Sequence, residues 1–332
     1  MNIMDIIEKG LAAKEPLLEA EALALLQVQP DSREAFYLRW AGLCKSRALS
    51  GGKAEIHAQI GLDSGPCPKV CQFCAFASVN NDPNAPKKPE ASLEEVLAYA
   101  EGYAEAGANA ILLLSTEAYD FDTFLEMGVR VRERIGFGTP LLANTGDLTP
   151  AKAEALRNAG FAGLYHALRL GEGEVTDIRQ ETRLSTMEAA RMAGLPLSTC
   201  LEPIGPEHSA EAIYAIAAQM LALKPITAGV GRRVAVPGVE ASRNGVLSQP
   251  QNAVYAAAYR LIDHRSRLTA SAHSELMANS GANIAWSEVG SNPRDRESKT
   301  ESGKGRSIEF IRNLFTEAGW ELLSGPSPGW AG

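Results

Sequence analysis

The chain has 332 residues, of which 45% are hydrophobic and 22% are charged, and its formal net charge at pH 7 is −8. This length suits one α/β barrel with additional terminal helices, and a core of that size closes without disulfides. An acidic chain with no basic run argues against a nucleic-acid or anionic-membrane partner, but leaves room for a small substrate.

Residues 1–52 are predicted to form an N-terminal helical cap. Leu17, Leu25 and Leu26 recur near helical spacing, and residues 29–32 separate this helix from a second one that carries Trp40. The early residues are acidic where a secretory signal would be basic, and no run of about 18 apolar residues is present to cross a bilayer. We therefore expect a cytoplasmic protein.

Residues 53–320 are predicted to form a (β/α)₈ barrel of the TIM type, because strands and helices alternate along this part of the chain. Residues 321–332, rich in Gly, Pro and Ser, are expected to be a mobile tail. The eight expected strands are 54–63, 108–115, 140–146, 161–168, 195–203, 226–236, 267–272 and 282–286. The expected helices include 92–107, 121–135, 209–223, 249–264 and 306–318.

Three of the five cysteines lie within eight residues of each other, in the stretch GPCPKVCQFCAF at 65–76. Cys67, Cys71 and Cys74 have the spacing C-x3-C-x2-C and directly follow the first expected strand. In a reducing compartment such a cluster indicates a metal site rather than a disulfide framework. Three thiolates on one loop can ligate three irons of a [4Fe–4S] cubane, which leaves one iron open for a small molecule.

A zinc site is the alternative for these cysteines, with His57 or His166 as the fourth ligand. Structural zinc prefers paired C-x2-C knuckles or four clear ligands, and this chain has no second knuckle. The spacing therefore favours the iron–sulfur interpretation.

The cysteine motif, with Phe73 before its last cysteine, resembles the radical S-adenosylmethionine (SAM) superfamily. The helical cap, the barrel pattern and the run SGANIAWSEVGSNPRD at 280–295 are similar to the biotin synthase group within it. This group includes biotin synthase, the [FeFe]-hydrogenase maturase, methylornithine synthase and the radical enzyme of the [Fe]-hydrogenase cofactor pathway. The resemblance covers about residues 15–320 and implies a [4Fe–4S] cluster and SAM as cofactors.

The resemblance also implies residues that bind SAM. Ser115, Thr116 and Glu117 stand where the family places a short motif for the SAM amino group, with Ser and Thr in place of its glycine. Arg183 matches the family arginine that binds the SAM carboxylate, and Phe73 stands where an aromatic ring can pack on adenine. Plain alternatives are a helix-terminal charge for Glu117, a surface arginine for Arg183 and loop packing for Phe73.

Arg169 and Glu172, after the fourth expected strand, match polar SAM contacts of the maturase-like members, although solvated loop charges are an equal alternative. Cys200 and Arg267 resemble two ligands of the auxiliary cluster of biotin synthase. The two further auxiliary cysteines are absent, so a buried packing role for Cys200 is at least as good an interpretation. Cys44, on the cap, is expected to serve packing only.

Polar residues after the sixth and seventh strands are candidates for substrate contacts at the barrel mouth. Arg232 and Arg233 could hold a carboxylate or phosphate, and His273 and Glu275 follow the seventh strand. Paired surface charge and a structural histidine are the alternatives.

Taken together, the resemblance predicts reductive SAM cleavage to a 5′-deoxyadenosyl radical, followed by hydrogen abstraction from a small molecule. The absent auxiliary cysteines favour rearrangement, fragmentation or metallocofactor maturation over sulfur insertion of the biotin or lipoyl type. A one-electron donor such as flavodoxin or ferredoxin is the expected partner. A scaffold that carries a cluster or zinc without catalysis is the alternative from another class.

Overall fold

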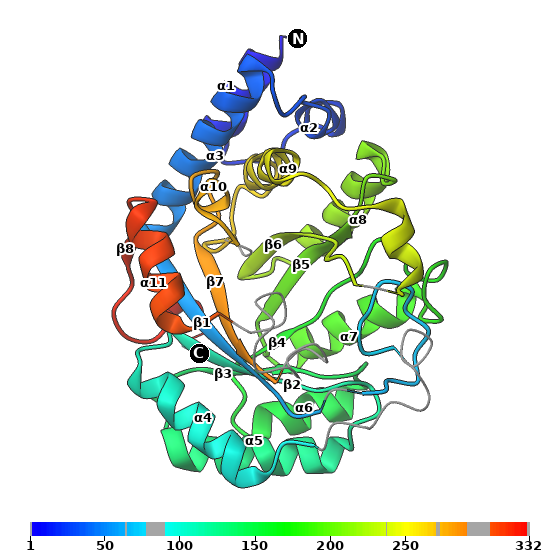
Figure 1. Ribbon diagram of the computed structural model, residues 1–332, viewed down its shortest axis with the longest axis vertical. Helices are drawn as coiled ribbons and strands as arrows, with labels where there is room; N and C mark the ends of the chain where they lie inside the picture. Colours follow the sequence, from blue (N-terminus) through cyan, green and yellow to red (C-terminus); the bar gives the residue numbers. More distant parts are fainter. Residues whose placement is uncertain are drawn as a thin grey trace.

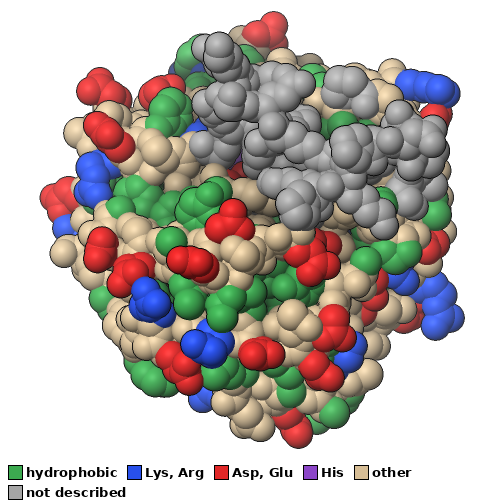
Figure 2. Space-filling view, turned by 60° about the horizontal axis from the view of Figure 1, so that its bottom comes forward, with side chains coloured by type: hydrophobic (Ala, Val, Ile, Leu, Met, Phe, Trp, Pro, Cys, Tyr) green, Lys and Arg blue, Asp and Glu red, His purple; other side chains and the backbone are tan. Residues whose placement is uncertain are grey.

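The computed structural model describes residues 2–63, 65–77, 90–236, 238–269, 273–290 and 306–330. Helices surround a curved parallel sheet, and the N-terminal helices stand at one end of the molecule (Figure 1). Within the described residues, no helix combines the length and the apolar character needed to cross a membrane. Acidic and basic side chains are interspersed with apolar ones on the face drawn in Figure 2.

The N-terminal cap contains three helices rather than the two expected: α1 (Ile3–Ala12), α2 (Glu19–Leu26) and α3 (Arg33–Ser50). Ser32 caps α3, because its hydroxyl accepts a hydrogen bond from the Ala35 amide. The cap packs on α9 (Gln249–Ile262) through Gly42, where a Cβ atom would come within 3.0 Å of the Ala257 Cα. This close crossing requires glycine, and it fixes the cap to the rest of the fold.

The sheet has the strand order β6-β5-β4-β3-β2-β1-β7, with a short β8 paired to β1. Every pairing between these strands is parallel. The carboxyl ends of neighbouring parallel strands therefore meet at one edge, where barrel active sites belong. The strands are β1 (Lys53–Gly61), β2 (Ala110–Leu114), β3 (Leu141–Asn144), β4 (Gly163–Tyr165), β5 (Leu197–Ile204), β6 (Thr227–Arg232), β7 (Ile284–Val289) and β8 (Glu321–Leu322).

The expected eight-strand barrel is present only as a partial barrel. The seventh expected strand, 267–272, is reduced to one parallel bridge between Leu268 and Thr227, and residues 270–272 lie outside the described part. Leu268 still accepts a hydrogen bond from the Ala228 amide, and Thr269 accepts one from the Asn283 amide. This short segment therefore joins β6 to the start of β7 near the amino ends of the strands, without forming a regular strand.

The helices outside the sheet agree closely with the expected ones, and α5 has the predicted limits. Their apolar faces and the outer faces of the strands form one large buried core. The remaining helices are α4 (Leu93–Glu105), α5 (Phe121–Ile135), α6 (Pro150–Asn158), α7 (Gln180–Met192), α8 (Ala210–Ala222), α10 (Glu275–Ala278) and α11 (Ile308–Glu317), with 3₁₀ turns η2 (Glu240–Asn244) and η4 (Pro328–Trp330).

The expectation of a mobile tail is wrong for its described residues. Trp330 is buried inside the curve of the sheet against Ala110, Leu112 and Leu142. Asn109 holds the segment through its side-chain amide, which donates to the Leu323 and Gly325 carbonyls. Composition suggested mobility, but the burial of one large aromatic side chain outweighs it.

Candidate active site

The cysteine loop follows β1 at the carboxyl edge of the sheet, and backbone hydrogen bonds hold it in place. The Cys67 amide donates to the Phe76 carbonyl at 2.7 Å, which closes the loop on itself. The Gln72 amide donates to the Val175 carbonyl at 3.0 Å, and the Gln72 carbonyl accepts from the Ala241 amide. The loop is therefore fixed both to the segment after β4 and to η2.

All three motif cysteines line one cavity of about 220 Å³, together with residues from the carboxyl ends of β1 to β4. Burial and the neighbouring Cys74 raise the pKa of Cys71 to about 12, against the opposing charge of Arg169. Burial likewise raises the pKa of Cys67. A metal bound here must therefore displace thiol protons. Phe73 lines the same cavity.

Neither histidine considered for zinc stands free as a fourth ligand. His57 is fully buried on β1, where its Nε2 atom lies 3.0 Å from Glu55 and its ring contacts Trp286 edge-on. His166 does line the cavity, but its Nε2 atom lies 3.0 Å from Asp147. Within the described residues, no three His, Cys, Asp or Glu side chains are compact enough to hold a single metal ion.

The segment after β2 lies beside the cysteines, as expected, but its residues differ in what they present to the cavity. Thr116 is engaged by Asp63, whose carboxylate accepts from both the Thr116 amide and its hydroxyl, at 2.7 and 2.5 Å. Ser115 donates its hydroxyl to Thr145 at 3.1 Å. Thr116 is thus a structural residue that joins the ends of β1 and β2. Asp63 was missed because a lone aspartate after a strand carries no signal in the sequence.

Glu117 lies over the loop that follows β3. Its carboxylate accepts a hydrogen bond from the Asp147 amide at 3.2 Å. A Cβ atom on Gly146 would come within 2.3 Å of this carboxylate, so a larger residue there would require the Glu117 side chain to move. No cation pairs with Glu117 among the described residues. The carboxylate thus faces the cavity with acceptor capacity to spare.

Arg183, in the first turns of α7, is buried between two carboxylates. Its Nη1 atom lies 3.1 Å from both oxygens of Asp147, and its Nε atom donates to Glu172 at 3.2 Å. The Nη2 atom has no hydrogen-bond partner among the described residues. The guanidinium is therefore held rigidly with one donor edge available to the cavity that it lines.

Asp147 is a central residue of this site that the sequence did not reveal. Burial opposes its ionisation, but the hydrogen bond from His166 and the charge of Arg183 hold its pKa well below the ordinary value. Thr186 also donates to it, at 3.1 Å. Burial lowers the pKa of His166 despite this contact, so we assign a neutral imidazole that donates from Nε2.

Glu172 and Arg169 are both near the cavity, in different roles. Glu172 is buried and accepts from the Arg169 amide at 2.9 Å and from Arg183, so its carboxylate is committed to the protein. The Arg169 guanidinium lines the cavity and lies 3.6 Å from Glu202. Tyr165, also at the cavity, donates to the same Glu202 at 2.7 Å. These groups form a polar wall at the carboxyl ends of β4 and β5.

The two arginines expected at the mouth have separate environments. Arg233 is buried, donates to the Gly245 carbonyl and forms a two-point ion pair with Glu207, so the structure gives it a structural role. The charge of Arg232 acts on His273. Desolvation, the charge of Arg306 and the charge of Arg232 together lower the pKa of that imidazole. Arg306 lies 3.4 Å from the His273 Nδ1 atom.

Cys200 and Arg267, which resemble two ligands of an auxiliary cluster, make their contacts in different parts of the sheet. Cys200 is buried on the inner face of β5, next to Gly231. Arg267 instead pairs with Glu55 at 3.2 Å and donates to the Ser50 carbonyl, near the amino end of β1. Cys44 lies on α3 in the cap.

Comparison with known proteins agrees with this arrangement. Residues 64–220 match the model of the radical SAM superfamily. A biotin synthase from Nitratidesulfovibrio vulgaris is 29% identical over 189 residues, which cover 54% of this chain and 51% of that protein. A biotin synthase from Thermus thermophilus is 27% identical over 272 residues, covering 79% of this chain and 82% of that protein. The match thus spans only about half the length of the first of these relatives.

Solved structures show the same fold. Methylornithine synthase superposes with a TM-score of 0.79 at 17% sequence identity, covering 96% of this chain and 97% of that one. The [FeFe]-hydrogenase maturase from Carboxydothermus hydrogenoformans superposes with a TM-score of 0.76 at 18% identity, covering 96% of this chain and 78% of that one.

A cysteine loop at the carboxyl edge of a partial parallel barrel, together with the match over residues 64–220, defines the class: the chain carries a radical SAM domain. It is a distant relative of biotin synthases and shares its fold with methylornithine synthase and the hydrogenase maturase. A radical SAM domain implies a [4Fe–4S] cluster and SAM.

Proposed function

We propose that the enzyme cleaves SAM reductively and uses the resulting 5′-deoxyadenosyl radical to remove a hydrogen atom from a small molecule. One observation carries this proposal: three thiols, an unpaired carboxylate and an anchored guanidinium line a single cavity of about 220 Å³. A passive metal carrier has no need of the last two groups, whereas an amino-acid ligand does.

The donor set at the cavity fits a [4Fe–4S] cluster. Cys67, Cys71 and Cys74 would ligate three irons, and the loop that carries them is fixed by backbone hydrogen bonds on two sides. When bound, the cluster supplies the electron that splits SAM into methionine and the 5′-deoxyadenosyl radical. The protein contributes the rigid loop and a partly buried site that keeps water from the radical.

The cavity also fits the amino-acid end of SAM. Glu117 would accept hydrogen bonds from the ammonium group, because its carboxylate has no cationic partner among the described residues. Arg183 would donate from Nη2 to the carboxylate while Asp147 and Glu172 hold its other nitrogens. Phe73 would pack on the adenine ring, and Arg169 would face the ligand from the β4 side.

The substrate would enter beside the residues at the end of β6 and just before α10. Arg232 and His273 stand at these positions, and such polar groups suit a polar or anionic substrate. We propose rearrangement, fragmentation or metallocofactor maturation as the reaction class, with a one-electron donor such as flavodoxin or ferredoxin. A cytoplasmic location remains part of this proposal.

Cluster content gives the first test. The anaerobically reconstituted protein should hold about four irons per monomer, as one cubane requires. The triple variant Cys67→Ala, Cys71→Ala, Cys74→Ala should hold none of this iron, whereas Cys44→Ala should hold the full amount. Equal iron content in the triple variant and the wild type would contradict the proposal.

A further inference from the structure

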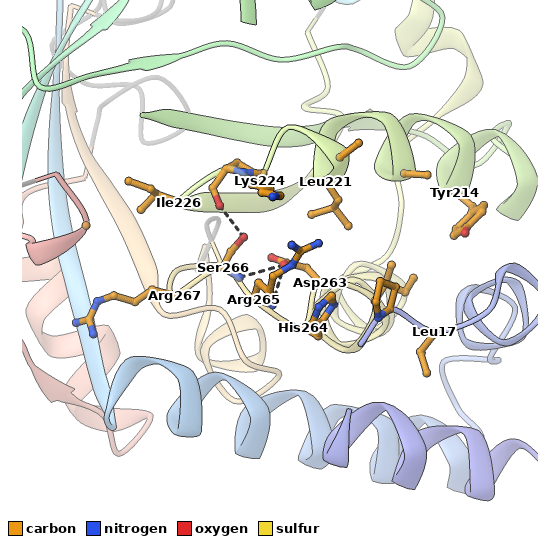
Figure 3. A pocket seen from close by; sticks show the side chains of 16 residues that line it. Leu17, Tyr214, Leu221, Lys224, Ile226, Asp263, His264, Arg265, Ser266 and Arg267 are labelled. Atoms are coloured by element: carbon orange, nitrogen blue, oxygen red, sulfur yellow. Dashed lines mark hydrogen bonds between the residues drawn. The ribbon is translucent and has the colours of Figure 1, made fainter. Parts of the chain in front are cut away.

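A second, larger cavity of about 560 Å³ lies near the amino end of β6, away from the cysteine loop at the carboxyl ends of the strands. Figure 3 shows the side chains that line it. The cavity is bordered by α8, by the start of β6, by the segment after α9 and by Leu17 of the cap. Its size is typical of sites for small organic molecules. The radical chemistry at the carboxyl ends of the strands makes no use of this cavity.

The charges around this cavity leave an excess of positive charge. Asp263 is balanced by Arg260 at 3.1 Å, and Arg267 is balanced by Glu55 at 3.2 Å. Lys224 and Arg265 form no ion pair among the described residues. Among the residues that the structure describes, two exposed cations without an ion-pair partner therefore border one cavity in a chain whose net charge is −8. Such a place attracts an anion.

The backbone brings these two cations to the same rim. The Ser266 hydroxyl donates to the Pro225 carbonyl at 3.0 Å, which ties the segment of Arg265 to the segment of Lys224 (Figure 3). Lys224 follows the C-cap of α8 and has a φ of 54°, the left-handed conformation with which helices commonly end.

Apolar side chains form the wall toward α8 and the cap. Leu17, Leu221 and Ile226 line it, with Tyr214 on α8 (Figure 3). Ala218, also on α8, lines the same wall. Lys224 and Arg265 therefore stand near the start of β6, and the apolar side chains extend along α8 toward the cap.

We propose that this cavity binds a small amphipathic organic anion. Its carboxylate or phosphate group would lie between Lys224 and Arg265, and its aliphatic or aromatic body would lie along Leu221 and Ile226. This site is independent of the radical SAM site and does not rest on the proposed function.

Binding of octanoate, octyl phosphate and 1-octanol, measured by calorimetry on the reconstituted enzyme, tests the proposal. Both anions should bind, and 1-octanol should bind at least about tenfold more weakly, because it lacks the charge. The double variant Lys224→Gln, Arg265→Gln should lose about tenfold or more in affinity for both anions. The matched control Lys152→Gln, Arg157→Gln on α6 should keep the wild-type affinity. The tighter of the two anions identifies the head group.

A second variant tests the apolar half without altering charge. Ala218 is an exposed position on α8 that lines the cavity, and Ala218→Phe should fill it and weaken both anions about tenfold or more. SAM binding should be unchanged in every variant. A failure of this proposal can therefore be told apart from a failure of the proposed function. The proposal is overturned if no anion binds at about 1 mM, if 1-octanol binds as tightly as octanoate, or if both variants bind as the wild type does.

Discussion

The Nη1 atom of Arg183 lies 3.1 Å from both carboxylate oxygens of Asp147. This contact joins the loop after β3 to the start of α7 across the floor of the cavity. His166 and Thr186 complete the hydrogen bonding of the same carboxylate. The guanidinium that we assign to SAM is thereby oriented by the protein before any ligand arrives.

Replacement of Asp147 by Asn should lower the free energy of unfolding by about 3 kcal/mol at pH 7, because it leaves a buried guanidinium half-paired. The folded pKa of Asp147 lies below its unfolded value, so its stabilising effect is full above the unfolded pKa and falls as the protein is acidified. Urea unfolding should show the difference between wild type and variant shrinking below about pH 5.

The control for this experiment is Glu188→Gln, which removes an exposed carboxylate paired with Arg191 on α7. It should change stability little at either pH, since exposed ion pairs contribute weakly. A difference between wild type and Asp147→Asn that stays constant with pH would show that this carboxylate is not held ionised by its partners.

SAM affinity should depend on Glu117 and Arg183. Glu117→Gln removes the negative charge opposite the ammonium, and Arg183→Lys removes the planar donor edge. Each should weaken SAM binding by about 1.5–3 kcal/mol, the scale of a charge-assisted hydrogen bond, with iron content unchanged. Calorimetry on reconstituted protein measures this, and Arg191→Gln is the control. Wild-type affinity in both variants would place SAM elsewhere.

Arg233 should matter for stability rather than for catalysis. Arg233→Met should lower the free energy of unfolding by about 2 kcal/mol, less than for a fully buried pair because Glu207 is partly exposed. SAM binding and turnover should be retained in the folded protein. Arg243→Met, at an exposed pair with Glu240, should leave stability nearly unchanged. A variant of normal stability with lost turnover would return Arg233 to the active site.

A substitution at Cys200 distinguishes sulfur insertion from the other reaction classes. Donation of sulfide by an auxiliary cluster needs several protein ligands, yet Cys44 lies in the cap and Arg267 pairs with Glu55. Cys200→Ser should therefore leave iron content and SAM cleavage nearly intact. Mössbauer spectroscopy of iron-enriched protein should show one cluster per monomer. A second signal that disappears in Cys200→Ser would make sulfur insertion the better function.

Local patterns in the sequence were enough to predict the cysteine loop and most elements. The motif spacing, the apolar run that became β2 and the limits of α5 are each encoded within a short stretch of the chain. The sequence pattern also overestimated regularity: the segment after α9 alternates like a strand but forms only the bridge at Leu268. Whether this segment pairs as a strand depends on the unpaired backbone groups of β6 and β7, which lie elsewhere in the sequence. A local sequence pattern holds no information about them.

The partners of the charged residues could not be predicted for the same reason. Arg183 and Arg233 look alike in the sequence, but Arg183 borders the cavity while Arg233 is enclosed by Glu207 and Gly245. Asp147 and Asp63 carry no motif, because their roles come from strands that meet only in the folded protein. Trp330 was overlooked since its surroundings in the chain are those of a loop.

The formation of 5′-deoxyadenosine from SAM tests the central claim most directly. The reconstituted protein, given SAM and dithionite without oxygen, should release 5′-deoxyadenosine and methionine, measured by chromatography and mass spectrometry. The triple cysteine variant should release neither above the level of a protein-free reaction. Wild-type protein with a full cluster that yields no 5′-deoxyadenosine, or a triple variant that yields as much as wild type, would contradict the account.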